Sequence, residues 1–272
     1  MSGFPPETVQ APNGTAIVLR SCEGYDELEA CVRLQIETWG YDDGDVIPRR
    51  MFKVAQRVGG QAIGAFDPAG EMVGFAMSIP GMKPGPDASR PQVPYLHSHM
   101  LAVTPKYRNA GVGRRLKLYQ RAEAVSRGIQ LMEWTFDPLE IKNAYLNIHR
   151  LGVIVRAYSP NFYGVSSSRL QAGLPTDRLH AEWWMESERV RAILSGIPYS
   201  PPQIQETIMV PKAIATWKAE SVSHAQAVQA ENRDRFLAAF GRGLAVVGFQ
   251  TDDEGNGIYE LGRLHQPDLG VL

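Results

Sequence analysis

The spacing of apolar residues changes several times along the first part of the chain, and each change predicts an element of secondary structure. From Asp26 to Gly40 the apolar positions recur three and four residues apart, which predicts a helix that Gly40 closes. A pair formed by Asp26 and Glu29 is expected to cap its start. A short apolar run predicts a strand at 16–20 before this helix, and a second, shorter helix is expected at 48–57.

Two further runs, 61–66 and 71–79, predict a pair of strands, and the turn residues between them are typical of a hairpin. Residues 80–94 hold five prolines and two glycines, which predicts a long irregular loop. Such a loop is either a functional segment or a spacer, and both alternatives stay open. Residues 1–14, rich in Pro, Gly and polar side chains, are expected to be loose and flexible.

A strand, a glycine-containing turn and a helix come next. The alternating run around Leu101 and Val103 predicts a buried strand, and the apolar spacing after the turn predicts a helix that ends at Gly128. The turn leaves backbone N–H groups without helical partners at the positive end of the helix dipole. Its glycines, Gly111 and Gly113, let an anionic ligand approach the main chain without meeting a Cβ atom. The sequence therefore predicts a site for phosphate or pyrophosphate.

Strands and helices continue to alternate as far as residue 185. The elements expected here are a strand at 129–136, a helix at 140–151 stopped by Gly152, and strands at 153–158 and 178–185. The order up to this point is β-α-α-β-β-β-α-β-α-β-β, which predicts an α/β fold.

Beyond residue 185 the chain adds a second series of elements. A helix and a proline-rich linker at 186–203 lead to a smaller β-α-α-β-β subdomain at 204–272. That order repeats the order of the first 79 residues. One hypothesis is that this subdomain is a half-copy of the amino-terminal half without its own phosphate turn; coincidence is the alternative.

The composition narrows the class of protein. The 272 residues are 44% hydrophobic, which suffices for one large or two modest domains. With 28 basic and 29 acidic residues the net charge is −1, which argues against nucleic acid or an anionic membrane as a partner. The two cysteines, Cys22 and Cys31, make no disulfide framework. Since neither a signal peptide nor an apolar run of about 20 residues is found, we expect a soluble, cytoplasmic protein.

The spacing of the phosphate turn separates three known types. A dinucleotide fingerprint requires a small residue where Leu116 stands, and a Walker loop requires Gly-Lys-Ser/Thr, which this turn lacks. What remains is the pattern Leu-x-Val-x-Pro-x-x-Arg-x-x-Gly-x-Gly, supplied by Leu101, Val103, Pro105, Arg108, Gly111 and Gly113. This pattern resembles motif A of the GNAT superfamily of acetyl-CoA-dependent N-acyltransferases. An ordinary strand-to-helix turn is the alternative.

The resemblance implies a GNAT fold over residues 15–185, with a mixed sheet that opens between its fourth and fifth strands to admit acetyl-CoA or another acyl-CoA. The pyrophosphate would lie on the amides of Asn109, Ala110, Gly111, Val112, Gly113 and Arg114, with Arg108 holding the turn. The main chain of Leu101 and Val103 would pair with the pantetheine arm, and Asn143 would contact the cofactor. The side chains of Arg114, Arg115 and Lys117 would meet further phosphate charge or lie on a solvated helix face.

Acyl transfer to an amine needs a base more than an acid. Deprotonating a lysine-like amine at pH 7 costs about 4.6 kcal/mol, whereas a thiol lies only about 2 kcal/mol from its thiolate. In some GNAT members a carboxylate base lies six residues before the position that Val103 matches, which is His97 here. Strand alternation is expected to put His97, His99, Leu101 and Val103 on one side. The alternative is that both histidines are polar residues of the sheet, and no third ligand signals a metal site.

For the acid, many family members carry a tyrosine four residues before the glycine that ends the helix, a position that Ile148 takes here. Tyr145, one turn earlier, is the candidate, with His149 as a further option. In the loop after the first helix, Tyr41, Asp42, Asp43 and Asp45 could attract a cationic amine or form a solvated acidic turn.

The resemblance thus implies an N-acyltransferase that moves an acetyl or other acyl group from CoA to a small-molecule or peptide amine by direct attack in a ternary complex. The alternative from another class is a catalytically silent acyl-CoA-binding or sensing protein with the same fold. The carboxy-terminal third could close over the active site or make the contact of a homodimer.

Overall fold

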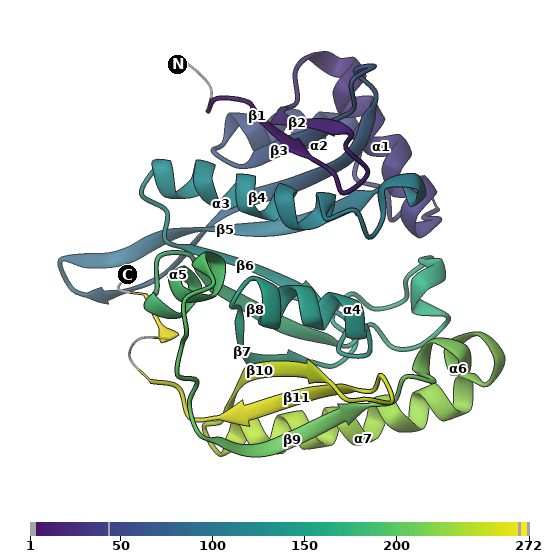
Figure 1. Ribbon diagram of the computed structural model, residues 1–272, viewed down its shortest axis with the longest axis vertical. Helices are drawn as coiled ribbons and strands as arrows, with labels where there is room; N and C mark the ends of the chain where they lie inside the picture. Colours follow the sequence, from purple (N-terminus) through teal and green to yellow (C-terminus); the bar gives the residue numbers. More distant parts are fainter. Residues whose placement is uncertain (1–3, 43, 266–267, 271–272) are drawn as a thin grey trace. The chain divides into compact units, whose positions relative to one another are not determined.

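The computed structural model describes residues 4–42, 44–265 and 268–270 (Figure 1). Contacts divide the chain into two compact units. The first contains the chain up to Met132 together with Ser167–Arg169, and the second contains Glu133–Ser166 and the chain from Leu170 onward. Asp43, which was expected in the acidic loop, lies outside the described residues.

The first unit is built on an antiparallel sheet with the strand order β1-β2-β3-β4-β5. Its strands are β1 (Glu7–Gln10), β2 (Ala16–Ser21), β3 (Gln61–Phe66), β4 (Met72–Asp87) and β5 (Arg90–Val103). Its helices are α1 (Gly24–Trp39), α2 (Arg49–Arg57) and α3 (Val112–Ser126), and the 3-10 turn η1 (Pro105–Tyr107) precedes α3. Residues 7–10 therefore form a strand beside β2 where a loose segment was expected.

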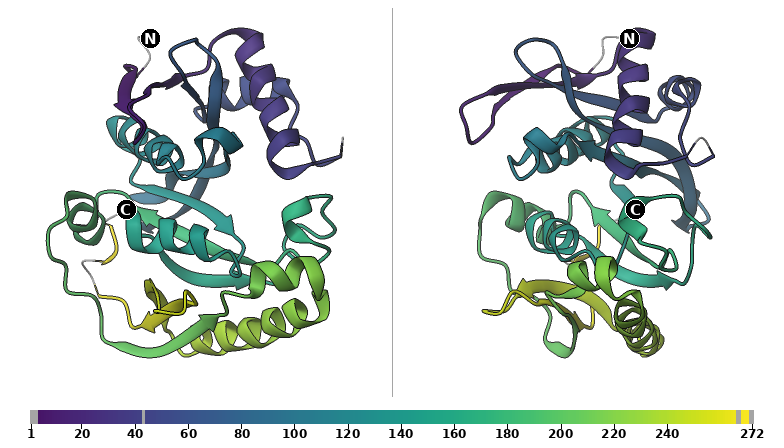
Figure 2. Two further views of the ribbon diagram at one scale, coloured as in Figure 1. Left: turned by 45° about the vertical axis from the view of Figure 1, so that its right-hand side comes forward. Right: turned by 90° about the vertical axis from the view of Figure 1, so that its right-hand side faces the viewer.

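Helices cover both faces of this sheet. On one face Leu116 of α3 packs in a hydrophobic cluster with Ile63 of β3. On the other face Leu28 of α1 and Phe52 of α2 pack with Phe75 of β4. Figure 2 shows the same arrangement, with α1 and α2 on one side of the strands and α3 on the other. Because it is covered on both sides, β3 is buried at every position.

The start of α1 differs from the expected cap. Glu23 is the N-cap residue, and its own side chain makes no capping bond. Instead, the Glu27 carboxylate accepts the backbone N–H of Glu23 at 2.6 Å. The predicted capping pair of Asp26 and Glu29 is therefore wrong. The side chain of Glu27, one turn after Glu23, points back toward the N-terminus of the helix and bonds the free N–H there.

The expected loop at 80–94 is wrong as well, because β4 and β5 continue through it as one long hairpin. Pro80 lies opposite Leu96, Pro94 opposite Met82, and Pro84 opposite Gln92. These pairs are an even number of residues apart along β4, so they belong to one class of the antiparallel ladder. Proline fits the class in which N–H groups point away from the partner strand, because no hydrogen bond is lost there.

The second unit has the strand order β6-β8-β7-β10-β11-β9. Its strands are β6 (Leu131–Phe136, which begins in the first unit), β7 (Ile154–Ser159), β8 (Arg178–Trp184), β9 (Ile204–Val210), β10 (Ala245–Thr251) and β11 (Gly257–Gly262). Its helices are α4 (Ile141–Ala144), the π-helical η2 (Tyr145–Arg150), α5 (Glu188–Ser195), α6 (Ile214–Glu220) and α7 (Val222–Gly241). The 3-10 turn η3 (Arg169–Gln171) crosses the boundary between the units along the chain.

The C-terminal extension, residues 204–262, continues the sheet of this second unit. Val246 of β10 pairs with Val155 of β7, and β11 lies between β10 and β9. Phe236 of α7 packs on this sheet, with its ring centroid 5.7 Å from that of Tyr158 and 5.1 Å from that of Tyr259. The extension therefore shares a hydrophobic core with β7, which precedes it in the chain.

The extension has the predicted β-α-α-β-β order, but its strands pair differently from those of the amino-terminal half. In the first unit the three strands to compare are β2, β3 and β4. The middle one in the sheet is β3, which is the second of them in the chain. In the extension the middle strand is β11, the third in the chain. A half-copy requires the same strand order in both segments, and the two orders differ.

The predicted element order over residues 16–184 is confirmed, and the fold is a mixed α/β fold as predicted. Cys22 and Cys31 are buried and free, with sulfur atoms 3.9 Å apart. The domain boundaries predicted near residues 15, 185 and 204 stay predictions.

Candidate functional site

The turn before α3 has an unusual backbone. Asn109 has a φ of 60° and Gly111 a φ of 77°, so both lie in the left-handed region. Gly111 is the N-cap residue of α3, and glycine adopts this conformation without the steric cost that a Cβ atom brings. Upstream, the N–H groups of Tyr107 and Arg108 donate to the carbonyls of Thr104 and Pro105, which fixes the entry into the turn.

The first turn of α3 presents backbone N–H groups at its open end. Arg115 donates its N–H to the Gly111 carbonyl at 3.1 Å, so the N–H groups of Val112 and Gly113 precede the first helical hydrogen bond. A Cβ atom added at Gly111 would meet nothing within 4 Å, which means that the space beside this residue is open. Asn109 and Gly111 are both exposed. This arrangement fits an anionic group.

Gly113 serves a different purpose from Gly111. A Cβ atom added at Gly113 would lie 3.4 Å from Leu101 Cδ2 and 3.9 Å from Val103 Cγ2, which is ordinary contact with the strand. The side chain of Arg108 returns to the same strand, where its Nε donates to the Val103 carbonyl at 3.3 Å. The turn is therefore held against the end of β5 from both sides.

A β-bulge in β5 changes which residues share a face. Met100 lies opposite Met77 and Ser98 lies opposite Ser78, so that His99 is the extra residue of the bulge. Leu101 then faces α3 together with Ser98, although the two are three residues apart. The prediction that His97 and Leu101 share one side is wrong, because the bulge reverses the alternation between them.

His97 consequently lies on the face of β5 that α1 and α2 cover, the face of Met100 and Ala102. Its side chain is half-buried, and its ring centroid lies 5.9 Å from that of His99. Burial lowers the pKa of His99 below its usual value, so His99 favours the neutral form. A neutral His99 adds no positive charge beside His97.

Lys117 lies neither at a phosphate surface nor on a solvated helix face, the two alternatives expected for it. It is 5% exposed, and its Nζ donates to Ser98 Oγ at 2.8 Å. Burial lowers the pKa of Lys117 well below its ordinary value. Arg115 is exposed and Arg114 half-buried, and these two are the first cations of α3 after the turn.

Asn143 and Tyr145 belong to the second unit. Asn143 is exposed on α4, and its Oδ1 accepts from Asn147 Nδ2 at 3.3 Å. Tyr145 is half-buried and begins the π-helical segment, where its ring stacks on His149 with centroids 4.5 Å apart. Ile148 is fully buried.

Ser167 makes hydrogen bonds to two described residues of the acidic loop after α1, Asp42 and Asp45. Ser167 donates both its N–H and its hydroxyl to Asp45 Oδ2, at 2.8 and 2.6 Å. The hydroxyl oxygen of Ser167 accepts the N–H of Asp42 at 3.0 Å. Tyr41 stacks on Trp39 with centroids 5.4 Å apart. The Asp42 side chain is exposed, while the Asp45 carboxylate is engaged by Ser167.

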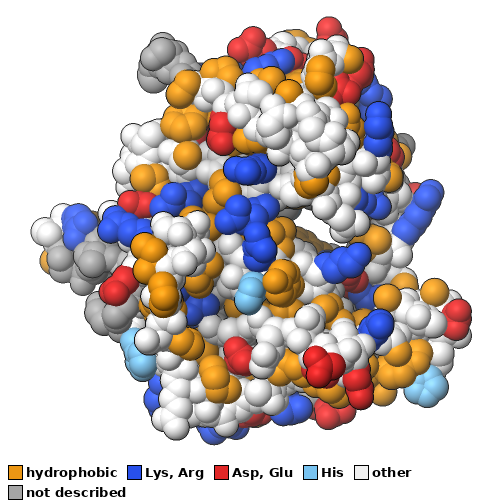
Figure 3. Space-filling view, in the orientation of Figure 1, with side chains coloured by type: hydrophobic (Ala, Val, Ile, Leu, Met, Phe, Trp, Pro, Cys, Tyr) orange, Lys and Arg blue, Asp and Glu red, His pale blue; other side chains and the backbone are white. Residues whose placement is uncertain are grey.

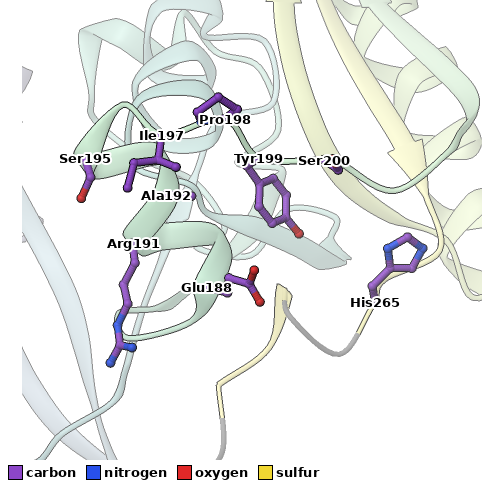
Figure 4. A pocket seen from close by; sticks show the side chains of 9 residues that line it. All are labelled: Glu188, Arg191, Ala192, Ser195, Ile197, Pro198, Tyr199, Ser200 and His265. Atoms are coloured by element: carbon purple, nitrogen blue, oxygen red, sulfur yellow. The ribbon is translucent and has the colours of Figure 1, made fainter.

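A separate pocket of about 660 Å³ lies in the second unit (Figure 4). It is lined by Glu188, Arg191, Ala192, Ser195, Ile197, Pro198, Tyr199, Ser200 and His265. None of the residues predicted to bind CoA or to catalyse transfer lines it. Over the second unit, acidic and basic side chains are interspersed (Figure 3).

The described residues were also searched for a metal site and for a membrane-spanning helix. Within the described ranges, no three His, Cys, Asp or Glu side chains are placed together to hold a metal ion. No helix in the described part of the chain combines the length and the apolar character needed to cross a bilayer.

Comparison with known proteins identifies the class of the region that carries this turn. Residues 28–145 match the model of the acetyltransferase (GNAT) family, and this part of the chain belongs to that family. The match includes β5, the turn and α3, and it ends at Tyr145. The predicted family is therefore confirmed for this range. Members of the family use acetyl-CoA.

Solved structures with a similar fold include yncA from Salmonella typhimurium with its cofactor acetyl-CoA, at 18% identity and a TM-score of 0.48, covering 62% of this chain and 94% of that chain. The ribosomal-protein-S18-alanine N-acetyltransferase from Escherichia coli is 16% identical, with a TM-score of 0.46 and coverage of 61% and 92%. Arabidopsis thaliana NAA60 with a bisubstrate analogue is 15% identical, with a TM-score of 0.49 and coverage of 62% and 98%. No curated protein matches the chain.

Proposed function

We propose that this protein is an acetyl-CoA-dependent N-acyltransferase that transfers an acetyl or other acyl group to an amine by direct attack in a ternary complex. The observation that carries the proposal is the open backbone turn at the N-terminus of α3, inside the segment that matches the GNAT family. The exposed left-handed residues Asn109 and Gly111 provide room and N–H donors for a pyrophosphate.

Acetyl-CoA would supply an activated thioester. The amides from Asn109 to Arg114 would hold its pyrophosphate, and the end of β5 at Leu101 and Val103 would pair with the pantetheine arm. Arg108, bonded to the Val103 carbonyl, keeps the turn and the strand together and so sets the distance between these two parts of the site.

His97 is the proposed base. It would take the proton that the amine must lose, a step that costs about 4.6 kcal/mol for a lysine-like amine at pH 7. Its position supports this role, because it lies half-buried on β5 on the face covered by α1 and α2, and the neutral His99 beside it does not oppose a positive charge. In the transfer a C–N bond forms and the C–S bond breaks.

Tyr145 is the proposed acid for the leaving thiolate, with His149 stacked on its ring as the other candidate. Because a thiol lies only about 2 kcal/mol from its thiolate, this proton contributes less than the one His97 removes. A catalytically silent acyl-CoA-binding protein is the second candidate. It is favoured by one observation, the fully buried Ile148 at the position where many relatives have a tyrosine.

One experiment tests the proposal against this rival. Release of free thiol from acetyl-CoA is followed with a panel of amines that includes polyamines, aminoglycosides and peptide N-termini, and CoA affinity is measured separately by calorimetry. We expect CoA binding and turnover with at least one acceptor that exceeds the turnover of His97→Ala. Tight CoA binding with no such turnover for any acceptor would establish the silent binder instead. Absence of CoA affinity would overturn both.

A further inference from the structure

The connection between β6 and α4 is a short turn with local hydrogen bonds of its own. Asp137 follows β6, and its Oδ1 accepts the N–H of Leu139 at 2.8 Å. The Asp137 carbonyl accepts the N–H of Glu140 at 3.2 Å, and Pro138 has no N–H to donate. We call residues 137–141 the β6–α4 turn. It leads directly into the helical segment that carries Asn143 and Tyr145.

The C-terminal extension supplies a buried cation to this turn. Lys218, on α6, places its Nζ 2.9 Å from Asp137 Oδ2 and 2.7 Å from Glu140 Oε1. The side chains of Lys218 and Asp137 are only 8% and 12% exposed. A pair buried to this extent depends on both members, because the loss of one leaves the other charge without compensation. Burial alone would lower the pKa of Lys218, and the two carboxylates reverse that effect, so its pKa is raised.

Strand β11 of the extension holds the same turn at another point. Tyr259 of β11 is fully buried, and its hydroxyl donates to the Pro138 carbonyl at 2.8 Å. Gly257, at the start of β11, lies beside Ile141: a Cβ atom there would come within 3.0 Å of Ile141 Cγ1 and within 2.7 Å of the Phe249 ring. Only glycine allows this close approach of β11 to the first residue of α4.

The extension also supports the helical segment that follows. Strand β10 packs against the π-helix η2, and the ring of Phe249 lies against that of Tyr259 with centroids 4.8 Å apart. Tyr259 is in turn backed by Phe236 of α7, as described above. The turn and the first residues of α4 are therefore fixed by side chains from α6, β10 and β11 together.

The position of the β6–α4 turn affects the two candidate site residues that follow it. Asn143 and Tyr145 lie two and four residues after Ile141, so a displaced turn would move both. A misplacement of about 1 Å, even from a change remote from the reacting atoms, can cost an enzyme on the order of 100-fold in rate.

From these contacts we propose that the C-terminal extension is a working part of the acyl-transfer site, in which Lys218 and Tyr259 act as positioning residues that hold the β6–α4 turn and thereby Asn143 and Tyr145. The proposal rests on the proposed acyltransferase function. It assigns the C-terminal extension a role inside the second unit. The β6–α4 turn and the start of α4 would depend on that extension for their position.

The test uses the full chain with Lys218→Met, which keeps the length of the side chain and removes the charge, and Lys218→Arg, which restores the charge. Hydrogen exchange of the amides at 137–150 is measured together with kcat and with CoA affinity. For Lys218→Met we expect faster exchange over 137–150 and a fall in kcat of about tenfold or more. Lys218→Arg should recover most of both.

Asn232→Ala is the matched control. Asn232 is buried in the same extension, where its Nδ2 donates to the Met209 carbonyl, but it makes this bond between α7 and β9 instead of to the turn. It should therefore leave exchange at 137–150 and kcat close to those of the wild type. If Lys218→Met does not fold, Tyr259→Phe removes only the hydroxyl that binds Pro138 and should give the same pattern on a smaller scale.

Unchanged exchange at 137–150 with kcat within twofold of the wild type in folded Lys218→Met, or in Tyr259→Phe if that variant takes its place, would overturn the proposal. An equal effect from Asn232→Ala would also overturn it, because the contribution would then be general stability. Failure of the acyltransferase function is a separate result. It would appear as no transfer by the wild-type protein, while the exchange measurements would still report whether the extension holds the turn.

Discussion

Lys117 Nζ lies 2.8 Å from Ser98 Oγ, and both side chains are buried between α3 and β5. Ser98 in turn donates to Gln120 Oε1 at 3.0 Å, and Gln120 Nε2 donates to Gln61 Oε1 at 3.2 Å. The hydroxyl of Ser78 reaches the same Gln61 oxygen at 2.9 Å. A polar chain therefore crosses from α3 to β5, β4 and β3 beside the bulge at His99.

Lys117→Met should make the first unit more stable at pH 7. Burial lowers the pKa of Lys117, so between the lowered pKa and about 10.5 the unfolded chain holds a proton that the folded chain lacks. The unfolding free energy of the wild type therefore rises with pH through this window, by at most about 1.4 kcal/mol per pH unit. Methionine removes this dependence, and the gain over the wild type should shrink as the pH approaches 10.5.

Urea unfolding at several pH values from 7 to 10 measures this difference. Lys53→Met is the control, because Lys53 is exposed on α2. It should leave the pH dependence of the wild type unchanged. A Lys117→Met variant that is less stable than the wild type at pH 7, with a constant difference up to pH 10, would show that the bond to Ser98 outweighs the cost of burying the amine.

Gly111→Glu should abolish CoA binding, because it brings a side chain and a negative charge into the open space beside the turn. The left-handed φ of 77° adds a strain of about 1–2 kcal/mol, which the fold should tolerate with a small fall in Tm. Gly128→Glu is the matched control: Gly128 follows α3 with a φ of 78° and nothing within 4 Å of an added Cβ atom, and CoA affinity should stay close to that of the wild type.

Calorimetric titration with CoA measures both variants. If Gly111→Glu bound CoA as tightly as the wild type, the turn would not be the pyrophosphate site and the basis of the proposed function would be lost. If Gly128→Glu lost affinity as strongly as Gly111→Glu, the effect would come from added charge or backbone strain in general and not from the turn.

Regular periodicity made most of the elements predictable. The helix that ends at Gly40 and the strand-turn-helix around Gly111 appear where the spacing of apolar residues put them. Each depends on local signals, an apolar repeat and a glycine in the left-handed region, which a sequence displays directly. The same local signals led to the family, because motif A is a contiguous pattern.

What the sequence did not reveal depends on pairing between segments. The bulge at His99 is a mismatch of register between β4 and β5, and it alone decides that His97 and Leu101 lie on opposite faces. The prolines of 80–94 suggested a loop because the class of ladder position that tolerates them is set by the partner strand. The sequence alone suggests that Lys117 is a surface residue, because its burial depends on the position of Ser98 in another segment.

His97→Ala should lower kcat by roughly 10²–10⁴ with any amine that the protein accepts, because the amine then lacks its proton acceptor. CoA affinity should not change, since His97 lies on the face of β5 opposite the one that packs on α3. Steady-state thiol release over a range of pH and CoA calorimetry check these points. A variant with full activity would leave His97 as a polar residue of the sheet.

Tyr145→Phe should have a smaller effect. A leaving thiolate needs only about 2 kcal/mol of help at pH 7, so the loss of the acid should lower kcat by no more than about 30-fold. Phenylalanine keeps the ring that stacks on His149, and the π-helix should keep its stability. His149→Ala is the companion variant, which tests whether the imidazole donates the proton instead. A fall of more than about 10³-fold in Tyr145→Phe would contradict the energetic argument, because it would require Tyr145 to do more than protonate a thiolate.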